Sequence, residues 1–218
     1  MSSVFRGPAI VLVAVFALAA CGGAGIGTTV PQGAMSQSRA HKASGSYNCP
    51  SNPKGTGILP DGDFSQVADE SYGYKKDQIF APSWEVSKGT IDFYASTGPS
   101  NPGLDGLCWV DMDGYTAGGI RSSGFSTKPG QMYMLSFLFS GNGGSGPTIK
   151  TLKVSIDHQF TQFTWNISGG NDLGNGDYTI ATWKFRSTGK FAVLTFTSLD
   201  PRKSLSGAAV GGIAVTKS

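Results

Sequence analysis

The feature that most constrains the fold is a series of short apolar runs, each separated from the next by turn-forming residues. The runs 132–139 and 150–156 are rich in aromatic and aliphatic residues, and the second alternates apolar with polar positions, as a half-buried strand does. Gly, Asn, Asp and Pro gather between such runs, as at 140–147 and 169–177. No segment of 12 or more residues has the apolar period of an amphipathic helix. We therefore predict an all-β protein, an antiparallel jelly-roll β-sandwich.

The composition agrees with many strands joined by tight turns. Of 218 residues 32 are glycine, and only 14% are charged, against about 25% in an average domain. Aromatic residues make up 11%, which is enough to form a core and excludes a highly charged disordered chain. Further strands are expected at 91–94, 109–112, 160–165, 179–185, 191–196 and 208–215.

The charge distribution argues against a nucleic-acid partner. All 14 acidic residues lie at or after Asp61, and from Gly57 onward they face 13 basic residues. That part of the chain is therefore close to neutral, although the formal net charge of the whole is +3. Nucleic-acid binding needs a basic stripe that releases counterions, so we expect no nucleic-acid partner.

The amino terminus has the pattern of an export signal. Arg6 precedes an apolar run at 9–20, which is too short to span a bilayer. The run ends in Leu-Ala-Ala-Cys-Gly at 18–22, which resembles the lipobox of bacterial lipoproteins. That resemblance implies cleavage before Cys21, a lipid on its thiol, and a lipid-anchored, extracytoplasmic place in the bacterial cell envelope. The alternative is an ordinary secretory signal with a chance cysteine.

Three regions follow from this pattern. Residues 1–20 are expected to be a lipoprotein signal peptide, and 21–57 a flexible tether, because that segment is rich in Gly, Ser, Thr, Ala and Gln and has few large hydrophobes. Residues 58–218 contain all four tryptophans and are expected to form the sandwich domain.

The order of motifs in residues 58–218 resembles that of the DUF642 group and its bacterial choice-of-anchor C relatives. The family's opening strand corresponds to Asp-Gly-Asp-Phe-Ser at 61–65, and its Pro-x-Trp-x-Val element to 82–86. Its Val-Asp-Leu-Asp-Gly motif is matched by Val-Asp-Met-Asp-Gly at 110–114. Its Pro-Gly-x-x-Tyr-x-Leu-Ser-Phe strand is matched at 129–137, and its Thr-Phe-x-Ser-Leu strand at 195–199.

This resemblance implies a jelly-roll domain of the galactose-binding-like type that binds carbohydrate or cell-wall glycan and has no catalytic machinery. Related sandwiches often hold a structural calcium between acids of the first and last strands, to which Asp61 and Asp63 would contribute here. Ser65 replaces the opening acid, and Gly211 and Gly212 replace the closing ones. Since calcium prefers six to eight oxygen ligands, this site is expected to be weak or lost. The alternative is that 61–62 forms only a turn.

Two cysteines remain once Cys21 is assigned to lipid. Outside the cytoplasm, Cys49 and Cys108 are an even pair that predicts a disulfide between the end of the tether and the domain. The alternative is two free thiols.

Four tyrosines are candidates for a sugar-binding rim, because sugars stack their C–H faces on aromatic rings. They lie in polar or glycine-rich stretches that are typical of loops: Tyr72, Tyr74, Tyr115 and Tyr178. Trp84, within its family motif, is expected to be a core residue.

Catalytic patterns are weak. His158 stands beside Asp157, but no Gly-x-Ser-x-Gly accompanies them, and a surface turn is the favoured interpretation. Asp111 and Asp113 share a strand face and could form a carboxylate pair for glycoside chemistry, but the favoured interpretation is solvent-facing acids or turn formers.

The sequence therefore predicts a lipid-anchored, non-enzymatic module that binds polysaccharide or cell-wall glycan. The main alternative is a structural or protein-interaction domain at the surface, and a glycan hydrolase is the third.

Overall fold

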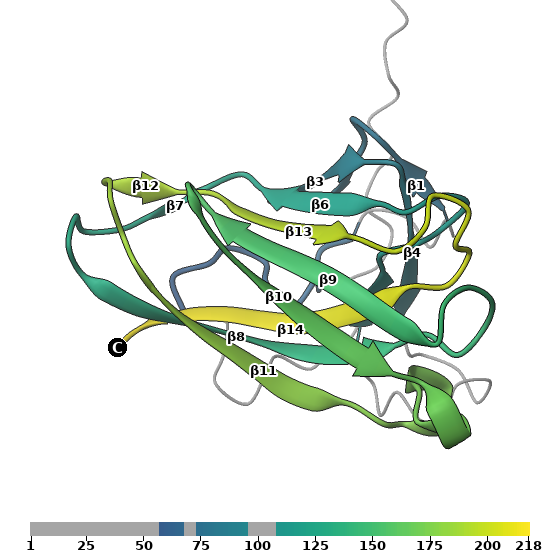
Figure 1. The fold of residues 1–218 in the computed structure, drawn as a ribbon. Helices are drawn as coiled ribbons and strands as arrows, with labels where there is room; N and C mark the ends of the chain where they lie inside the picture. Colours follow the sequence, from purple (N-terminus) through teal and green to yellow (C-terminus); the bar gives the residue numbers. More distant parts are fainter. Residues whose placement is uncertain (1–56, 68–72, 96–107) are drawn as a thin grey trace, which may run out of the picture. The chain divides into compact units, whose positions relative to one another are not determined.

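Two six-stranded antiparallel sheets enclose one hydrophobic core in the computed structural model (Figure 1). The structure describes residues 57–67, 73–95 and 108–218, all of which belong to one unit of the chain, His41–Ser218. The predicted signal peptide, and the tether apart from its last residue, lie outside these ranges. Within the described ranges, no helix has both the length and the apolar character that a membrane span requires.

The first sheet has the strand order β1-β4-β5-β14-β8-β11, and the second has the order β10-β9-β13-β6-β3-β2. The first consists of β1 (Tyr74–Lys75), β4 (Thr90–Ala95), β5 (Cys108–Asp111), β14 (Ala208–Lys217), β8 (Met132–Gly141) and β11 (Thr179–Arg186). The second consists of β10 (Gln159–Asn166), β9 (Ile149–Ile156), β13 (Leu194–Ser198), β6 (Gly119–Ser122), β3 (Trp84–Lys88) and β2 (Ile79–Ala81). A separate pair joins β7 (Phe125–Ser126) to β12 (Phe191–Ala192), and two short 3₁₀ turns, η2 (Ser168–Gly170) and η3 (Leu173–Asn175), precede β11. Neighbours that are distant in sequence, such as β5, β14 and β8, give the jelly-roll arrangement and confirm the predicted fold class.

Alternating side chains place one face of each sheet in the core. In β9, Leu152, Val154 and Ile156 are fully buried, whereas the residues between them are half-buried on the other face. Aromatic rings join the two layers: the ring centroid of Phe137 in β8 lies 5.2 Å from that of Phe196 in β13. The core therefore depends on the period-two pattern that the sequence shows.

The beginning of the described chain lies along the last strand. The amide of Ile58 donates to the carbonyl of Val215 (2.9 Å), and the amide of Ile213 donates to the carbonyl of Gly62 (2.7 Å). A Cβ at Gly62 would lie 2.0 Å from the carbonyl oxygen of Ile213, so this approach requires glycine. Trp84 also joins this region to the core, since its indole Nε1 donates to the carbonyl of Asp61 (2.9 Å) and its side chain is buried, as predicted.

The predicted strands agree closely with the observed ones. Every predicted apolar run overlaps a strand, and only 191–196 is divided, because Val193 lies between β12 and β13. The opening strand that the resemblance implies at 61–65 is not observed, because this segment forms turns instead. β1, β2 and β7 have only two or three residues each, which is too few for a sequence pattern to reveal.

Candidate functional site

The outward face of the second sheet is polar over its central strands, β3, β6, β13 and β9, while the exposed hydrophobic residues Ile79 and Phe160 lie on its edge strands β2 and β10. Register places Glu85 of β3 opposite Arg121 of β6, and Arg121 in turn opposite Thr195 of β13. The half-buried or exposed residues of this face are Glu85, Ser87, Arg121, Thr151, Lys153, Ser155, Thr195 and Thr197. The face thus offers a row of hydrogen-bonding groups between charged residues.

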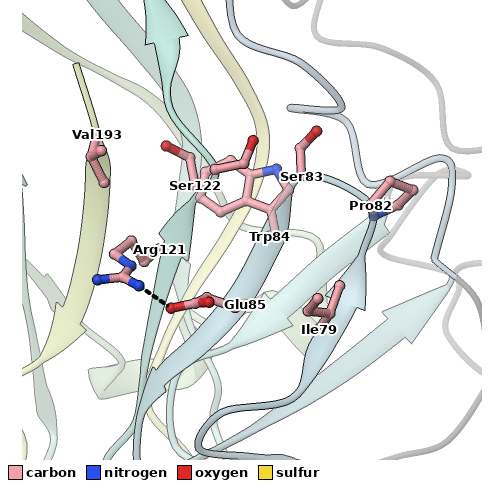
Figure 2. Close-up of a pocket in the computed structure, with 9 residues that line it drawn as sticks. Ile79, Pro82, Ser83, Trp84, Glu85, Arg121, Ser122 and Val193 are labelled. Atoms are coloured by element: carbon pink, nitrogen blue, oxygen red, sulfur yellow. Dashed lines mark ion pairs between the residues drawn. The ribbon is translucent and has the colours of Figure 1, made fainter. Parts of the chain in front are cut away.

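A pocket of about 460 Å³ lies at one end of this face (Figure 2). We call it the β3–β6 pocket. It is lined by Ile79, Pro82, Ser83, Trp84, Glu85, Arg121, Ser122, Ser123 and Val193. The lining residues come from β2, β3, β6 and the link between β12 and β13, so regular strands hold most of the pocket.

An ion pair occupies the base of the β3–β6 pocket. Arg121 Nη2 lies 2.5 Å from Glu85 Oε1, while the side chains remain 53% and 37% exposed, respectively. Apolar side chains stand beside the pair, with Ile79 and Val193 both exposed. The pocket therefore combines an anionic acceptor, several N–H donors and apolar walls, which is the combination by which binding sites orient small polar ligands.

Backbone contacts hold the walls of the pocket in place. Ser122 Oγ accepts a hydrogen bond from the amide of Leu194 (3.0 Å), which ties β6 to the start of β13. The amide of Ser123 donates to the carbonyl of Ser83 (2.8 Å), which ties the end of β6 to the β2–β3 turn. The pocket is therefore largely preformed.

A second group of charges is buried beyond the other ends of these strands, and we call it the buried charged cluster: Asp111, Asp113, Lys150 and Asp200. The Asp111 carboxylate accepts hydrogen bonds from the amides of Asp113 (2.9 Å) and Gly207 (2.9 Å) and from Asn142 Nδ2 (2.6 Å).

Lys150 completes the cluster from the opposite sheet. Its Nζ donates to the carbonyls of Ser145 (3.1 Å) and Ser206 (2.5 Å). Asp200 Oδ1 accepts from the amide of Thr151 (2.8 Å). These contacts fasten the loops 142–148 and 199–207 to the sandwich.

Burial dominates the electrostatics of the cluster. It raises the pKa of Asp111 to about 7, against the lowering effect of its hydrogen bonds, and it raises the pKa of Asp200 to about 6. Burial also lowers the pKa of Lys150, although the neighbouring aspartates oppose that shift. Both carboxyl oxygens of Asp113 are buried, and the proximity of Asp113 adds to the raised pKa of Asp200.

Of the two interpretations of Asp111 and Asp113, the solvent-facing one is wrong, whereas the hydrogen bond from the Asp113 amide to Asp111 Oδ1 agrees with a turn-forming role. As the alternation predicted, Val110 and Met112 pack in the main core while the two aspartates are directed elsewhere. Their side is nevertheless covered, because loop residues such as Asn142 and Gly207 close over them; both aspartates are fully buried. A pair of carboxylates that solvent cannot reach is poorly placed to act on a glycoside.

The structure places three of the four predicted tyrosines, and their surroundings differ. Tyr74 was predicted to lie in a loop, and that prediction is wrong: it belongs to β1, its side chain is buried, and its ring centroid lies 5.7 Å from that of Phe80. Tyr115 is 78% exposed, and Tyr178 is 43% exposed with its ring edge-to-face against Trp109. Tyr72 lies outside the described residues. None of these tyrosines that the structure describes lines the β3–β6 pocket.

Asp61 and Asp63 make turn contacts. Asp63 Oδ1 accepts from the amide of Ser65 (3.2 Å), and Asp61 Oδ1 accepts from the amide of Gln66 (3.4 Å). Asp61 has a φ of 48°, a left-handed conformation that aspartate tolerates in turns. Among residues 57–67, 73–95 and 108–218, no group of three or more His, Cys, Asp or Glu side chains could hold a metal ion. Asp61 Oδ2 is buried without a hydrogen-bond partner among the described residues, so a contribution of Asp61 and Asp63 to a weak calcium site stays a prediction.

Of the predicted cysteine and histidine sites, the structure describes Cys108 and His158. Cys108 is disulfide-bonded, whereas Cys49 and Cys21 lie outside the described residues, so the pairing of Cys49 with Cys108 stays a prediction. His158 is exposed in the turn between β9 and β10.

Sequence reasoning missed Glu85 and Arg121 as site residues. A weak signal was present, since Glu85 stands between the buried Trp84 and Val86 and must therefore point outward. Nothing in the sequence indicates that Arg121 pairs with it, because β3 and β6 are far apart along the chain and only their strand pairing places the two residues opposite each other.

The fold and the site define an all-β jelly-roll sandwich with a polar outward face. A family model described as "Protein of unknown function (DUF642)" matches residues 57–210, and the chain belongs to this family, as predicted. A curated relative is halomucin of Haloquadratum walsbyi (strain DSM 16790 / HBSQ001), 24% identical over 142 residues; the match covers 65% of this chain and 1% of halomucin.

Solved structures with a similar fold include TmCBM61 in complex with β-1,4-galactotriose, at 13% identity and a TM-score of 0.46, covering 74% of this chain and 99% of that one. Another is a family 35 carbohydrate binding module from Clostridium thermocellum, at 16% identity and a TM-score of 0.38, covering 59% of this chain and 92% of that one.

Proposed function

We propose that this chain is a non-catalytic domain that binds polysaccharide or cell-wall glycan through the β3–β6 pocket. The observation that carries the proposal is the exposed Glu85–Arg121 ion pair between apolar walls. Neighbouring sugar hydroxyls are both donors and acceptors, so one can donate to the Glu85 carboxylate while the next accepts from the Arg121 guanidinium. Ile79, Pro82 and Val193 would contact the apolar C–H face of the ring.

The absence of catalysis is part of this proposal. Glycosidases place two accessible carboxyl groups on either side of the scissile bond. In the β3–β6 pocket the single carboxylate, Glu85, is paired with Arg121, and the carboxyl groups of Asp111 and Asp113 are buried in a separate cluster. This arrangement supports recognition of a glycan rather than its cleavage.

The test is retention on insoluble polysaccharides and on a glycan array, competed with free oligosaccharide. Glu85→Gln and Arg121→Gln should each weaken retention by about 10- to 100-fold, because a charge-assisted hydrogen bond contributes about 1.5–3 kcal/mol. The matched controls are Asp77→Asn and Lys76→Gln, which break the exposed Lys76–Asp77 pair (3.9 Å) and should leave retention unchanged.

Failure of the wild-type protein to bind any glycan would overturn the proposal. Retention that the Glu85 and Arg121 variants share equally with the wild type would place the binding site elsewhere. Crosslinking to a protein in the native envelope, without sugar-competed retention, would favour the structural or protein-interaction alternative.

We further propose that Cys21 carries a lipid that holds the domain at the extracytoplasmic side of a bacterial membrane. The proposal rests on Arg6, the apolar run 9–20 and the small residues that precede the cysteine. Several acyl chains together would anchor the protein stably. Cys21→Ser should abolish labelling by a radioactive fatty acid and release the protein from membranes or leave it unprocessed; normal membrane retention of this variant would contradict the anchor.

A further inference from the structure

A second hollow lies at the other end of the same outward face. It has a volume of about 430 Å³ and is lined by Lys88, Gly89, Thr116, Ala117, Asp200 and Arg202. We call it the Lys88–Arg202 pocket. Glu85 lines the β3–β6 pocket, and Lys88, three positions and about 10 Å further along β3, lines this one. The two hollows are therefore spaced so that one extended ligand can reach both.

The surface between the two pockets consists of small side chains and is rich in hydroxyl groups. Ser87, Thr195 and Thr197 are half-buried there, and Gly119 lies opposite both Lys88 and Thr197. A Cβ at Gly119 would lie 3.0 Å from the Phe196 carbonyl oxygen and 3.1 Å from Ser87 Oγ, so this position has little room for a side chain. No bulky side chain among these residues interrupts the path from one pocket to the other.

Positive charge predominates along this path. Arg121 stands at one end, Lys153 on the neighbouring strand β9, and Lys88 and Arg202 at the other end. Lys153 Nζ lies 4.6 Å from the centroid of the Phe160 ring and thus stays on this face, and Lys88 Nζ donates to the carbonyl of Ser198 (3.1 Å).

Within residues 57–67, 73–95 and 108–218, few acidic groups oppose these cations. Glu85 is already paired with Arg121. Asp200 is 8% exposed, and its Oδ2 is buried. Asp157 is exposed, but it lies in the turn after β9 rather than on a strand of this face. A ligand carrying negative charge would therefore meet unbalanced cations at Lys88, Arg202 and Lys153.

We propose that the ligand of this face is an anionic glycan, with a sugar ring in the β3–β6 pocket and a carboxylate or phosphate group of a following unit in the Lys88–Arg202 pocket. The inference rests on the proposed function and adds the chemical class of the ligand. Guanidinium and ammonium groups recognise carboxylate and phosphate alike, so the test separates the two sources.

The experiment measures the binding of residues 21–218, purified without the signal peptide, to a series of polyuronates. The control for each polyuronate is the same polymer after its carboxyl groups have been reduced to alcohols. Polymannuronate, polyguluronate, polygalacturonate and hyaluronan form the carboxylate arm, and poly(glycerol phosphate) teichoic acid forms the phosphate arm. At least one anionic polymer should bind ten or more times as tightly as its neutral partner. That binding should weaken steeply as salt is added, because salt screens exposed charges.

Variants connect the effect to this face. Lys88→Gln, Lys153→Gln and Arg202→Gln should each lower the affinity for the anionic polymer several-fold and leave binding of the neutral partner unchanged. Lys184→Gln, an exposed change on β11 of the first sheet, is the matched control and should have no effect.

Each outcome separates the inference from the proposed function. If neutral polymers bind as tightly as anionic ones, the anionic inference is wrong while glycan binding stands. If neither arm nor the neutral glycan array retains the protein, both fail. If Lys184→Gln reduces binding as much as Lys88→Gln, the charge effect is non-specific, and the proposed path between the two pockets is wrong.

Discussion

The exposed Glu85–Arg121 pair and the buried charged cluster contain the same kinds of groups in opposite surroundings. In the pocket both partners remain partly solvated, so their contact contributes little to folding and stays available to a ligand. In the cluster Asp111 and Lys150 are fully buried and depend on backbone partners in two loops. The comparison teaches that burial decides whether a charge in this sandwich serves recognition or architecture.

The largest expected effect comes from removing the single cation of the buried charged cluster. Lys150→Met should destabilise the protein by about 3–5 kcal/mol, since the three aspartates would lose their counter-charge and two loop carbonyls would lose their donor. The measurement is urea-induced unfolding at neutral pH.

Two controls sharpen the comparison between the regions. Lys153→Met makes the same change three residues along the same strand, on the outward face, and should cost no more than about 1 kcal/mol with the loss of its contact to Phe160. Glu85→Gln, in the exposed pair, should likewise cost less than about 1 kcal/mol. If Lys150→Met were as mild as these two, burial would not be what distinguishes the regions.

The free energy of unfolding should also depend on pH. Burial raises the pKa of Asp111 from 3.8 to about 7, so the folded protein binds a proton more tightly than the unfolded chain does. The corresponding stability is fully present below pH 3.8 and is lost as pH rises through about 7. Asp200, whose pKa is raised to about 6, acts in the same direction. From Asp111 alone, the free energy of unfolding should therefore fall across this window by on the order of 4 kcal/mol.

Asp111→Asn tests whether Asp111 causes this dependence of the unfolding free energy on pH. The variant keeps an acceptor oxygen for the amides of Asp113 and Gly207 but cannot ionise, so its unfolding free energy should change less with pH than that of the wild type. Asp77→Asn, at an exposed position, should keep the wild-type slope. An unchanged slope in Asp111→Asn would show that other groups set the pH dependence.

Much of the fold could be predicted because the strands are long enough to display their own periodicity. The alternation at 150–156 predicted both the strand and its buried face, and both are confirmed. Tyr74 escaped because its strand has two residues, and no pattern can be recognised over that length. For Asp111 and Asp113 the sequence predicted the correct face but not its burial, since the covering groups come from the distant residues Asn142 and Gly207.

By itself, the sequence determined the all-β class, the family and the period-two division between core and surface, because these depend on side chains close together along the chain. Only the tertiary structure decided that Glu85 meets Arg121 and that Lys150 meets loops from two distant parts of the chain. Such pairings follow from strand register and loop packing, and these are set by the closure of the whole sandwich rather than by any local pattern.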